Sequence, residues 1–156
     1  MKLTKKNPKF HQGIYIPKYK EKYTGKDYPR YMSSWELKLF RWCDDNDQVL
    51  QWSSENIVIP YANPITGRTH NYIVDAVIKL NTPQGTKKFL VEVKPYKQTI
   101  EPDINKPVKT KSQIYERLNY LKNKAKWDAA KMWCKKRDFE FCILTEHHLN
   151  IGKKYK

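Results

Sequence analysis

Apolar and charged positions alternate most clearly between residues 71 and 94. The segment from Asn71 to Leu80 alternates with a period of two, which predicts a strand with Asp75 on one face between two β-branched residues. The segment from Phe89 to Lys94 predicts a second strand, in which Glu92 and Lys94 share one face. Both segments carry large apolar groups on both faces, which is typical of strands buried within a sheet.

The turn between these segments predicts how they pair. Residues 81–86 contain Pro83 and Gly85 and indicate a hairpin. Antiparallel pairing about a centre between residues 83 and 84 places Asp75 opposite Glu92. Two buried carboxylates repel each other and raise one pKa unless a divalent cation joins them. A metal site is therefore one interpretation of these charges, and a local ion pair between Glu92 and Lys94 is the other.

The remaining pattern predicts helices on both sides of this sheet. A helix is expected from Ser33 to about Asp45, apolar most of the way round and therefore largely buried. Shorter strands are expected at residues 49–52, 57–61 and 139–144. A long basic helical region covers residues 110–137, with a possible break at 119–123. This order predicts one α/β domain with a central mixed β-sheet flanked by α-helices.

Glu36 has two interpretations that the pattern does not separate. Ser33 and Glu36 fit the S-x-x-E capping box, which is a purely structural role. Glu36 also shares a helical stripe with Phe40 and Cys43, which places a carboxylate on an apolar face. Glu36 is thus either a helix cap or an acid of a buried site.

The charge is large and unevenly placed. The 156 residues contain 31 Lys and Arg against 16 Asp and Glu, a formal net charge of +15. Residues 1–30 carry +7 and residues 106–137 carry +9, whereas residues 31–105 carry −1. This pattern suits a protein that holds a phosphate backbone with basic flanks and acts on it in the middle. A basic solvated surface without a target is the alternative.

Two further features concern compartment and membranes. No apolar run approaches the roughly 18 residues that a membrane-spanning helix needs, and an apolar leader is not expected at the N-terminus. The three cysteines are widely spaced and fit buried free thiols in a reducing cytosol.

The chain divides into three parts by composition. Residues 1–30 form a basic, tyrosine-rich N-terminal arm, residues 31–149 form the catalytic domain, and residues 150–156 form a basic tail. Tyrosines among lysines can stack on bases while the lysines meet phosphates, or they can pin the arm onto the domain. The predicted DNA contacts are Lys18, Lys20 and Lys22 in the arm and Lys122, Lys124, Lys126 and Lys131 in the long helix.

The acids and Lys94 have the chemistry of phosphodiester hydrolysis. Asp75 and Glu92 can hold Mg²⁺, with Mn²⁺ as a substitute, and the Val93 carbonyl can add a third ligand. Lys94 can orient or deprotonate the attacking water, and Glu36 can hold a second metal or its water shell. Supporting residues are Gln113, which can reach the site from the first turn of the long helix, and Glu55, which lines the site or is a turn acid.

This arrangement resembles the PD-(D/E)xK nuclease superfamily. The matching residues are Val74-Asp75 and Glu92-Val93-Lys94, preceded by a helical Glu36, with valine where the motif name has proline. A longer ordered series resembles the head completion nucleases of tailed phages and is similar to the endonuclease subunit of heteromeric DNA transposases. That series is Ser34-Trp35-Glu36, Trp52-Ser53-Ser54-Glu55, Val58-Ile59-Pro60-Tyr61, Val91-Glu92-Val93-Lys94-Pro95, Lys126-Trp127-x-Ala129-Ala130 and Phe141-x-Ile143-Leu144-Thr145-Glu146.

The resemblance implies a fold, a reaction and a setting. It implies a restriction-endonuclease-like core and a metal-dependent endodeoxyribonuclease that acts in head completion, on packaged genome ends or branched DNA. It implies DNA and phage head or neck proteins as partners, no membrane, no small-molecule cofactor, and a place in the host cytoplasm during assembly or in the virion. The alternatives are a non-catalytic DNA-binding structural protein of the head-neck junction and a transposase subunit.

Overall fold

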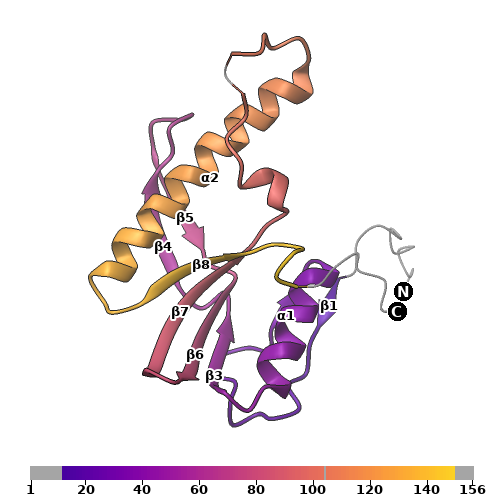
Figure 1. The fold of residues 1–156 in the computed structure, drawn as a ribbon, viewed down its shortest axis with the longest axis vertical. Helices are drawn as coiled ribbons and strands as arrows, with labels where there is room; N and C mark the ends of the chain where they lie inside the picture. Colours follow the sequence, from indigo (N-terminus) through magenta and orange to yellow (C-terminus); the bar gives the residue numbers. More distant parts are fainter. Residues whose placement is uncertain (1–11, 104, 150–156) are drawn as a thin grey trace.

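Four strands form the central sheet, in the order β3-β6-β7-β8. They comprise Val49–Ser54 (β3), Ala76–Thr82 (β6), Gly85–Val93 (β7) and Glu140–Leu144 (β8). Strand β6 is antiparallel to both β3 and β7, whereas β8 is parallel to β7, so the sheet is mixed. This computed structural model describes residues 12–103 and 105–149 (Figure 1). The predicted basic tail, residues 150–156, lies outside the described residues.

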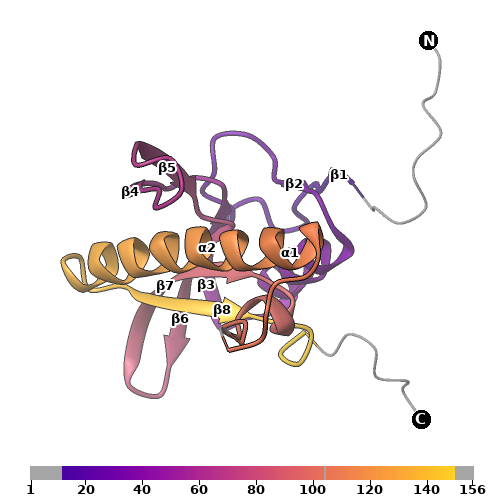
Figure 2. The same ribbon diagram turned by 90° about the horizontal axis from the view of Figure 1, so that it is seen from above.

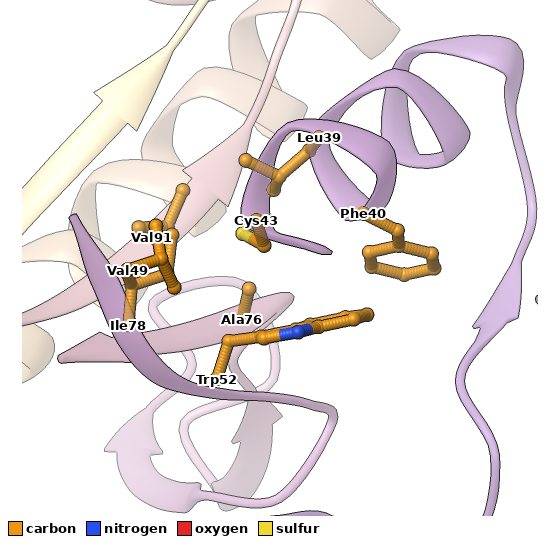
Figure 3. Close-up of a cluster of buried hydrophobic side chains, with 8 residues drawn as sticks. All are labelled: Leu39, Phe40, Cys43, Val49, Trp52, Ala76, Ile78 and Val91. Carbon is orange, nitrogen blue, oxygen red and sulfur yellow. The ribbon is translucent and has the colours of Figure 1, made fainter. Parts of the chain in front are cut away.

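Helices α1 (Ser34–Asp45) and α2 (Lys111–Lys135) cover opposite faces of the sheet. Alternate residues of β7 separate the two sides, since Val91 packs with residues of α1 and Leu90 packs with residues of α2. Figure 3 shows the first of these clusters, in which Leu39, Phe40 and Cys43 of α1 lie over the sheet. The α/β architecture with a central mixed sheet and flanking helices is therefore confirmed, and it is that of a restriction-endonuclease-like core.

Two short pairs of antiparallel strands lie beside the sheet. Strands β4 (Val58–Ala62) and β5 (Thr69–Ile73) pair with each other, and α2 packs against β4. Strands β1 (Gly13–Ile14) and β2 (Arg30–Tyr31) pair at the base of the N-terminal segment. In Figure 2 the two pairs project on the same side of the molecule, and Figure 1 shows β1 next to α1. The 3₁₀ turn η1 (Tyr96–Gln98) follows β7.

The single strand predicted from Asn71 to Leu80 is wrong in one respect, because the chain bends at Val74 and Asp75. Strand β5 ends at Ile73 and belongs to the β4-β5 pair, whereas β6 begins at Ala76 and belongs to the central sheet. The Val74 N–H donates to the Ile57 carbonyl, so the chain leaves one pair and enters the next at this point. Period-two alternation continues through such a bend, which is why the pattern did not reveal it.

Two helix predictions also need correction. The break predicted at residues 119–123 is absent, since α2 is continuous from Lys111 to Lys135. Helix α1 is not buried most of the way round, because the Trp42 side chain is 45% exposed. Within the described residues, no helix has the length and apolar character needed to cross a membrane.

Asp44, at the end of α1, holds the N-terminal arm against the domain. Its carboxylate is buried and accepts hydrogen bonds from the Tyr15 hydroxyl (2.6 Å) and from the backbone N–H groups of Lys18 (2.7 Å) and Tyr19 (3.1 Å). Burial alone would raise the pKa of Asp44, but these hydrogen bonds stabilise the carboxylate and leave the pKa lowered. Tyr15 and Tyr23 pack on the α1 side of the core. These tyrosines therefore pin the arm onto the domain.

Candidate active site

The β6-β7 hairpin brings Asp75 and Glu92 together. Ala76 pairs with Val91 and Thr82 with Gly85, which is the register predicted from the turn. Asp75 precedes β6 and extends this register toward Glu92, and its Oδ2 accepts a hydrogen bond of 2.8 Å from the Val93 N–H. Burial, followed by the charge of Glu92, raises the pKa of Asp75 well above its usual range. Asp75 and Glu92 therefore lie close together where the protein largely excludes water.

Glu92 is held in one orientation by two neighbours. Its side chain is buried, and Oε2 accepts a hydrogen bond from the Tyr72 hydroxyl. Oε1 lies 3.6 Å from the Nζ of Lys94, which shares its face of β7. The ion pair proposed from the sequence is therefore present. The charge of Lys94 also acts on Asp75, where it lowers the pKa of the carboxyl and partly offsets the effect of Glu92.

Tyr72 is a functional candidate that the sequence pattern missed. Simple alternation placed it on the face opposite Asp75, whereas the bend at residues 74–75 turns its hydroxyl to Glu92. Burial and the adjacent Glu92 carboxylate raise the pKa of this hydroxyl, so it stays a hydrogen-bond donor. The one signal in the sequence is a tyrosine three positions before Asp75 in an otherwise aliphatic face.

Glu36 shows features of both interpretations. The Ser33 side chain caps α1 by accepting from the Glu36 N–H (3.2 Å), and the Glu36 carboxylate accepts from the Met32 N–H rather than from the Ser33 N–H. Glu36 therefore supports the helix start by a variant of the capping box. Burial raises its pKa, and the charges of Glu55 and Glu92 raise it further. The charge of Glu36 also raises the pKa of Asp75, so we group Glu36 with Asp75 and Glu92 and call these three residues the acidic cluster.

Of the two residues predicted to support the site, Glu55 lies beside it and Gln113 does not contact it through the hydrogen bonds that its side chain makes. Glu55 follows β3 with a φ of 50°, and its N–H donates to the Asp75 carbonyl (3.2 Å), which places it beside the cluster. The Gln113 amide oxygen instead accepts from the N–H groups of Lys109 (2.6 Å) and Thr110 (3.2 Å) in the capping box of α2. These hydrogen bonds assign Gln113 a structural role in its own helix.

Lys126 brings a second positive charge toward the acids. Its Nζ lies 5.5 Å from the ring centre of Tyr72 and 5.8 Å from that of Tyr61. Burial and then the charge of Lys122 lower its pKa, while Glu92 and Asp75 act in the opposite direction. Lys122 is one helical turn from Lys126 and shares its side of α2.

The other predicted DNA contacts are placed differently. Lys124 and Lys131 are seven positions apart, so they share a stripe on the far side of α2 from Lys126. In the arm, the Lys18 Nζ lies 2.8 Å from Asp45, and Lys20 lies over the Tyr28 ring. The Lys22 Nζ donates to the carbonyl groups of Asp44 and Asn46 at the end of α1. Lys18 and Lys22 therefore have partners on the domain, and the whole set stays a prediction of DNA contacts.

The donor set around Asp75 fits a hard divalent cation. Both carboxylates keep capacity to accept a ligand bond, because each uses one oxygen for an identified hydrogen bond. Among residues 12–103 and 105–149, no group of three or more His, Cys, Asp or Glu side chains is arranged to hold a metal ion. A cation here would rely on two carboxylates, a backbone carbonyl such as that of Val93, and water. Mg²⁺ is commonly bound in this way, through one or two carboxylates and retained water.

Two comparisons with known proteins show the family of the chain. Residues 46–146, which include Asp75, Glu92 and Lys94, match the family described as TnsA-like endonuclease N terminal. The chain is also 34% identical over 145 residues to the head completion nuclease of Enterobacteria phage T4, covering 89% of this chain and 93% of that protein. The match extends beyond the catalytic motif to almost the whole sequence. The chain is therefore a member of the TnsA-like endonuclease family, and it is related to a phage head completion nuclease.

Proposed function

We propose that this protein is a metal-dependent endodeoxyribonuclease that acts in phage head completion. The observation that carries the proposal is the β6-β7 register, which brings the half-buried Asp75 and the buried Glu92 together beside Lys94. The phage relative supports the setting, because that protein is a head completion nuclease and is 34% identical to this chain over 145 residues. The proposed substrates are packaged genome ends or branched DNA, and the net charge of +15 suits a DNA partner.

The residues divide the chemistry among them. Asp75, Glu92 and the Val93 carbonyl would hold Mg²⁺, or Mn²⁺ in its place, and Glu36 would hold a second ion or its water. The bound ion would supply an acidified water and neutralise charge on the phosphate oxygens. Lys94 orients the attacking water with its Nζ and stabilises the negative charge that grows in the transition state. Tyr72 keeps the Glu92 carboxylate in place through its hydroxyl.

The proposed biological setting follows from the relative. Head or neck proteins of the capsid are the proposed protein partners, and the host cytoplasm during assembly is the proposed place of action, with the virion as a second location. The proposal requires neither a membrane nor a small-molecule cofactor.

A cleavage assay on linear, overhanging and branched DNA tests the activity. We expect wild-type protein to cut at least one substrate with Mg²⁺ or Mn²⁺ and to stop in EDTA. Lys94→Ala should abolish cutting, whereas Lys97→Ala, an exposed lysine three residues away, should cut like wild type. Equal cutting by Lys94→Ala and wild type would show that the assigned site is wrong.

One observation favours a second candidate, a non-catalytic DNA-binding protein of the head-neck junction. The Glu92 carboxylate is already engaged by Tyr72 and Lys94, as a purely structural ion pair would be. This candidate predicts tight DNA binding with no metal-dependent cleavage of any of the three substrates. The same assay therefore separates the two functions.

A further inference from the structure

A pocket adjoins the acidic cluster. It has a volume of about 560 Å³ and lies between the arm segment from Tyr23 to Arg30 and the end of β3 at Ser54. Its size falls within the range of about 300–1,000 Å³ that small-molecule sites occupy. Glu55 lines this pocket and also contacts Asp75 through its backbone, so the pocket and the candidate active site share a wall.

The wall formed by the arm is held in shape by contacts within the protein. The Tyr23 hydroxyl donates to the Asp27 carbonyl (2.7 Å), and the Tyr23 ring packs edge-on against Trp52 at 4.8 Å. A Cβ at Gly25 would collide with the Tyr23 hydroxyl, so the chain passes that ring closely. The Tyr15 N–H donates to the Pro29 carbonyl (2.9 Å) and closes the segment. A preformed pocket costs little ordering entropy when a ligand enters.

The lining residues have the chemistry of a nucleotide site. Lys26 and Arg30 supply positive charge for a phosphate, and Tyr28 is 47% exposed and offers a ring on which a base can stack. Asn56 and the carboxylate of Asp27 can hydrogen-bond to the amino and ring nitrogens of a base. The two carboxylates at the rim, Asp27 and Glu55, disfavour a small free polyanion and favour a ligand that presents a base as well as a phosphate.

The position of Glu55 connects the pocket to the reaction. Its backbone is in the left-handed region, with a φ of 50°, which residues other than glycine adopt rarely. Its N–H donates to the Asp75 carbonyl, so this conformation fixes the pocket rim relative to Asp75. A DNA strand with its phosphate at Asp75 and Glu92 can therefore continue across Glu55 into the pocket.

We propose that this pocket holds an unpaired nucleotide of the DNA strand that is cut. The inference rests on the proposed nuclease function and adds a substrate preference to it. A paired base is unavailable to Tyr28 because it is stacked in the duplex, and extruding it costs free energy that an overhang or branch does not require. The enzyme therefore prefers a cut next to unpaired DNA over a cut within a continuous duplex.

A binding experiment with matched tyrosine variants tests the pocket. The probe is a duplex with a three-nucleotide overhang that carries 2-aminopurine, made with either a 5′ or a 3′ overhang, and Ca²⁺ replaces Mg²⁺. Tyr28→Ala should weaken binding of one overhang about tenfold and leave blunt duplex unchanged, since a base stacked on an aromatic ring contributes about this much. Tyr19→Ala is the control, because Tyr19 is 45% exposed, also lies under lysines, and is outside the pocket.

A second variant keeps the test independent of one side chain. Lys26→Ala should weaken the same overhang duplex, whereas Lys135→Ala, an exposed lysine at the end of α2, should not. The proposal is overturned if Tyr28→Ala binds both overhang duplexes as tightly as Tyr19→Ala and wild type do, while wild type still cleaves DNA. Loss of overhang binding in Tyr28→Ala without any cleavage by wild type would support the pocket and refute the nuclease function.

Discussion

Glu36 provides a sharp test because a helix cap and a site acid respond differently to the same substitution. Glu36→Gln keeps an oxygen that can accept from the Met32 N–H but removes the charge. Glu36→Ala removes both. At acidic pH, where wild-type Glu36 is protonated, we expect Glu36→Ala to lose about 1 kcal/mol of unfolding free energy, because the Met32 N–H loses its acceptor at a place that water can reach. In a domain of this size that corresponds to a melting temperature about 2–4 °C lower.

The glutamine variant should behave differently with pH. Burial, with the charges of Glu55 and Glu92, raises the pKa of Glu36 above its value of 4.5, so the folded protein disfavours the carboxylate. Below the pKa of Glu36 in the unfolded chain, the group is protonated in both states and the folded state carries no penalty. As pH rises through the higher pKa of the folded state, Glu36 ionises in an unfavourable place and this stability is lost. Metal-free Glu36→Gln should therefore match wild type at acidic pH and be more stable than wild type at neutral pH.

Activity then separates the two roles. We expect Glu36→Gln to remain folded and to lose about 10- to 100-fold in cleavage rate, as residues that support a metal site commonly do. Ser33→Ala is the control, since it removes the helix cap at a cost of about 1 kcal/mol but leaves the acidic cluster intact. Thermal melts between acidic and neutral pH and a cleavage time course provide the two readouts. If Glu36→Gln cleaved DNA at the wild-type rate, a catalytic role for Glu36 would be refuted and only its role as a helix cap would remain.

Three further substitutions test other contacts. Asp44→Ala should lower the unfolding free energy by about 3 kcal/mol, measured by urea denaturation, because three donors in the arm lose a charged acceptor. Since the pKa of Asp44 is lowered, this contribution should be present above the unfolded pKa and vanish as pH falls through the folded value. Tyr72→Phe should slow cleavage about 10- to 100-fold with the fold retained in circular dichroism; an unchanged rate would remove Tyr72 from the site. Lys126→Met should reduce the salt dependence of DNA binding by about one phosphate contact, whereas an unchanged slope would exclude such a contact.

The sequence predicted the hairpin at the centre of the site because that information is local. Alternation sets the faces of β6 and β7, and the short turn between Thr82 and Gly85 sets their register. Asp75 therefore lies beside Glu92, as predicted. The assignment of Glu36 to the same cluster could not be settled from the sequence, because a capping box and a buried stripe call for the same residue.

The features that the sequence did not reveal depend on contacts between distant segments. The bend at Val74 leaves the alternation of apolar residues unchanged, yet it redirects Tyr72 toward Glu92. The Asp44 carboxylate accepts from the hydroxyl of Tyr15, which lies 29 positions away in the chain, and a local pattern does not reveal such a contact. Gln113 was expected near the site, but its amide caps the helix that carries it.

Asp75 and Glu92 are proposed to hold a divalent cation together next to Lys94. A crystal of the wild-type protein soaked in Mn²⁺ tests this proposal most directly, because the anomalous signal locates the ion. We expect a peak bridging the two carboxylates within reach of the Val93 carbonyl, and no such peak in Asp75→Ala. A peak elsewhere, or none between these side chains in a protein that cleaves DNA with Mn²⁺, would contradict the account.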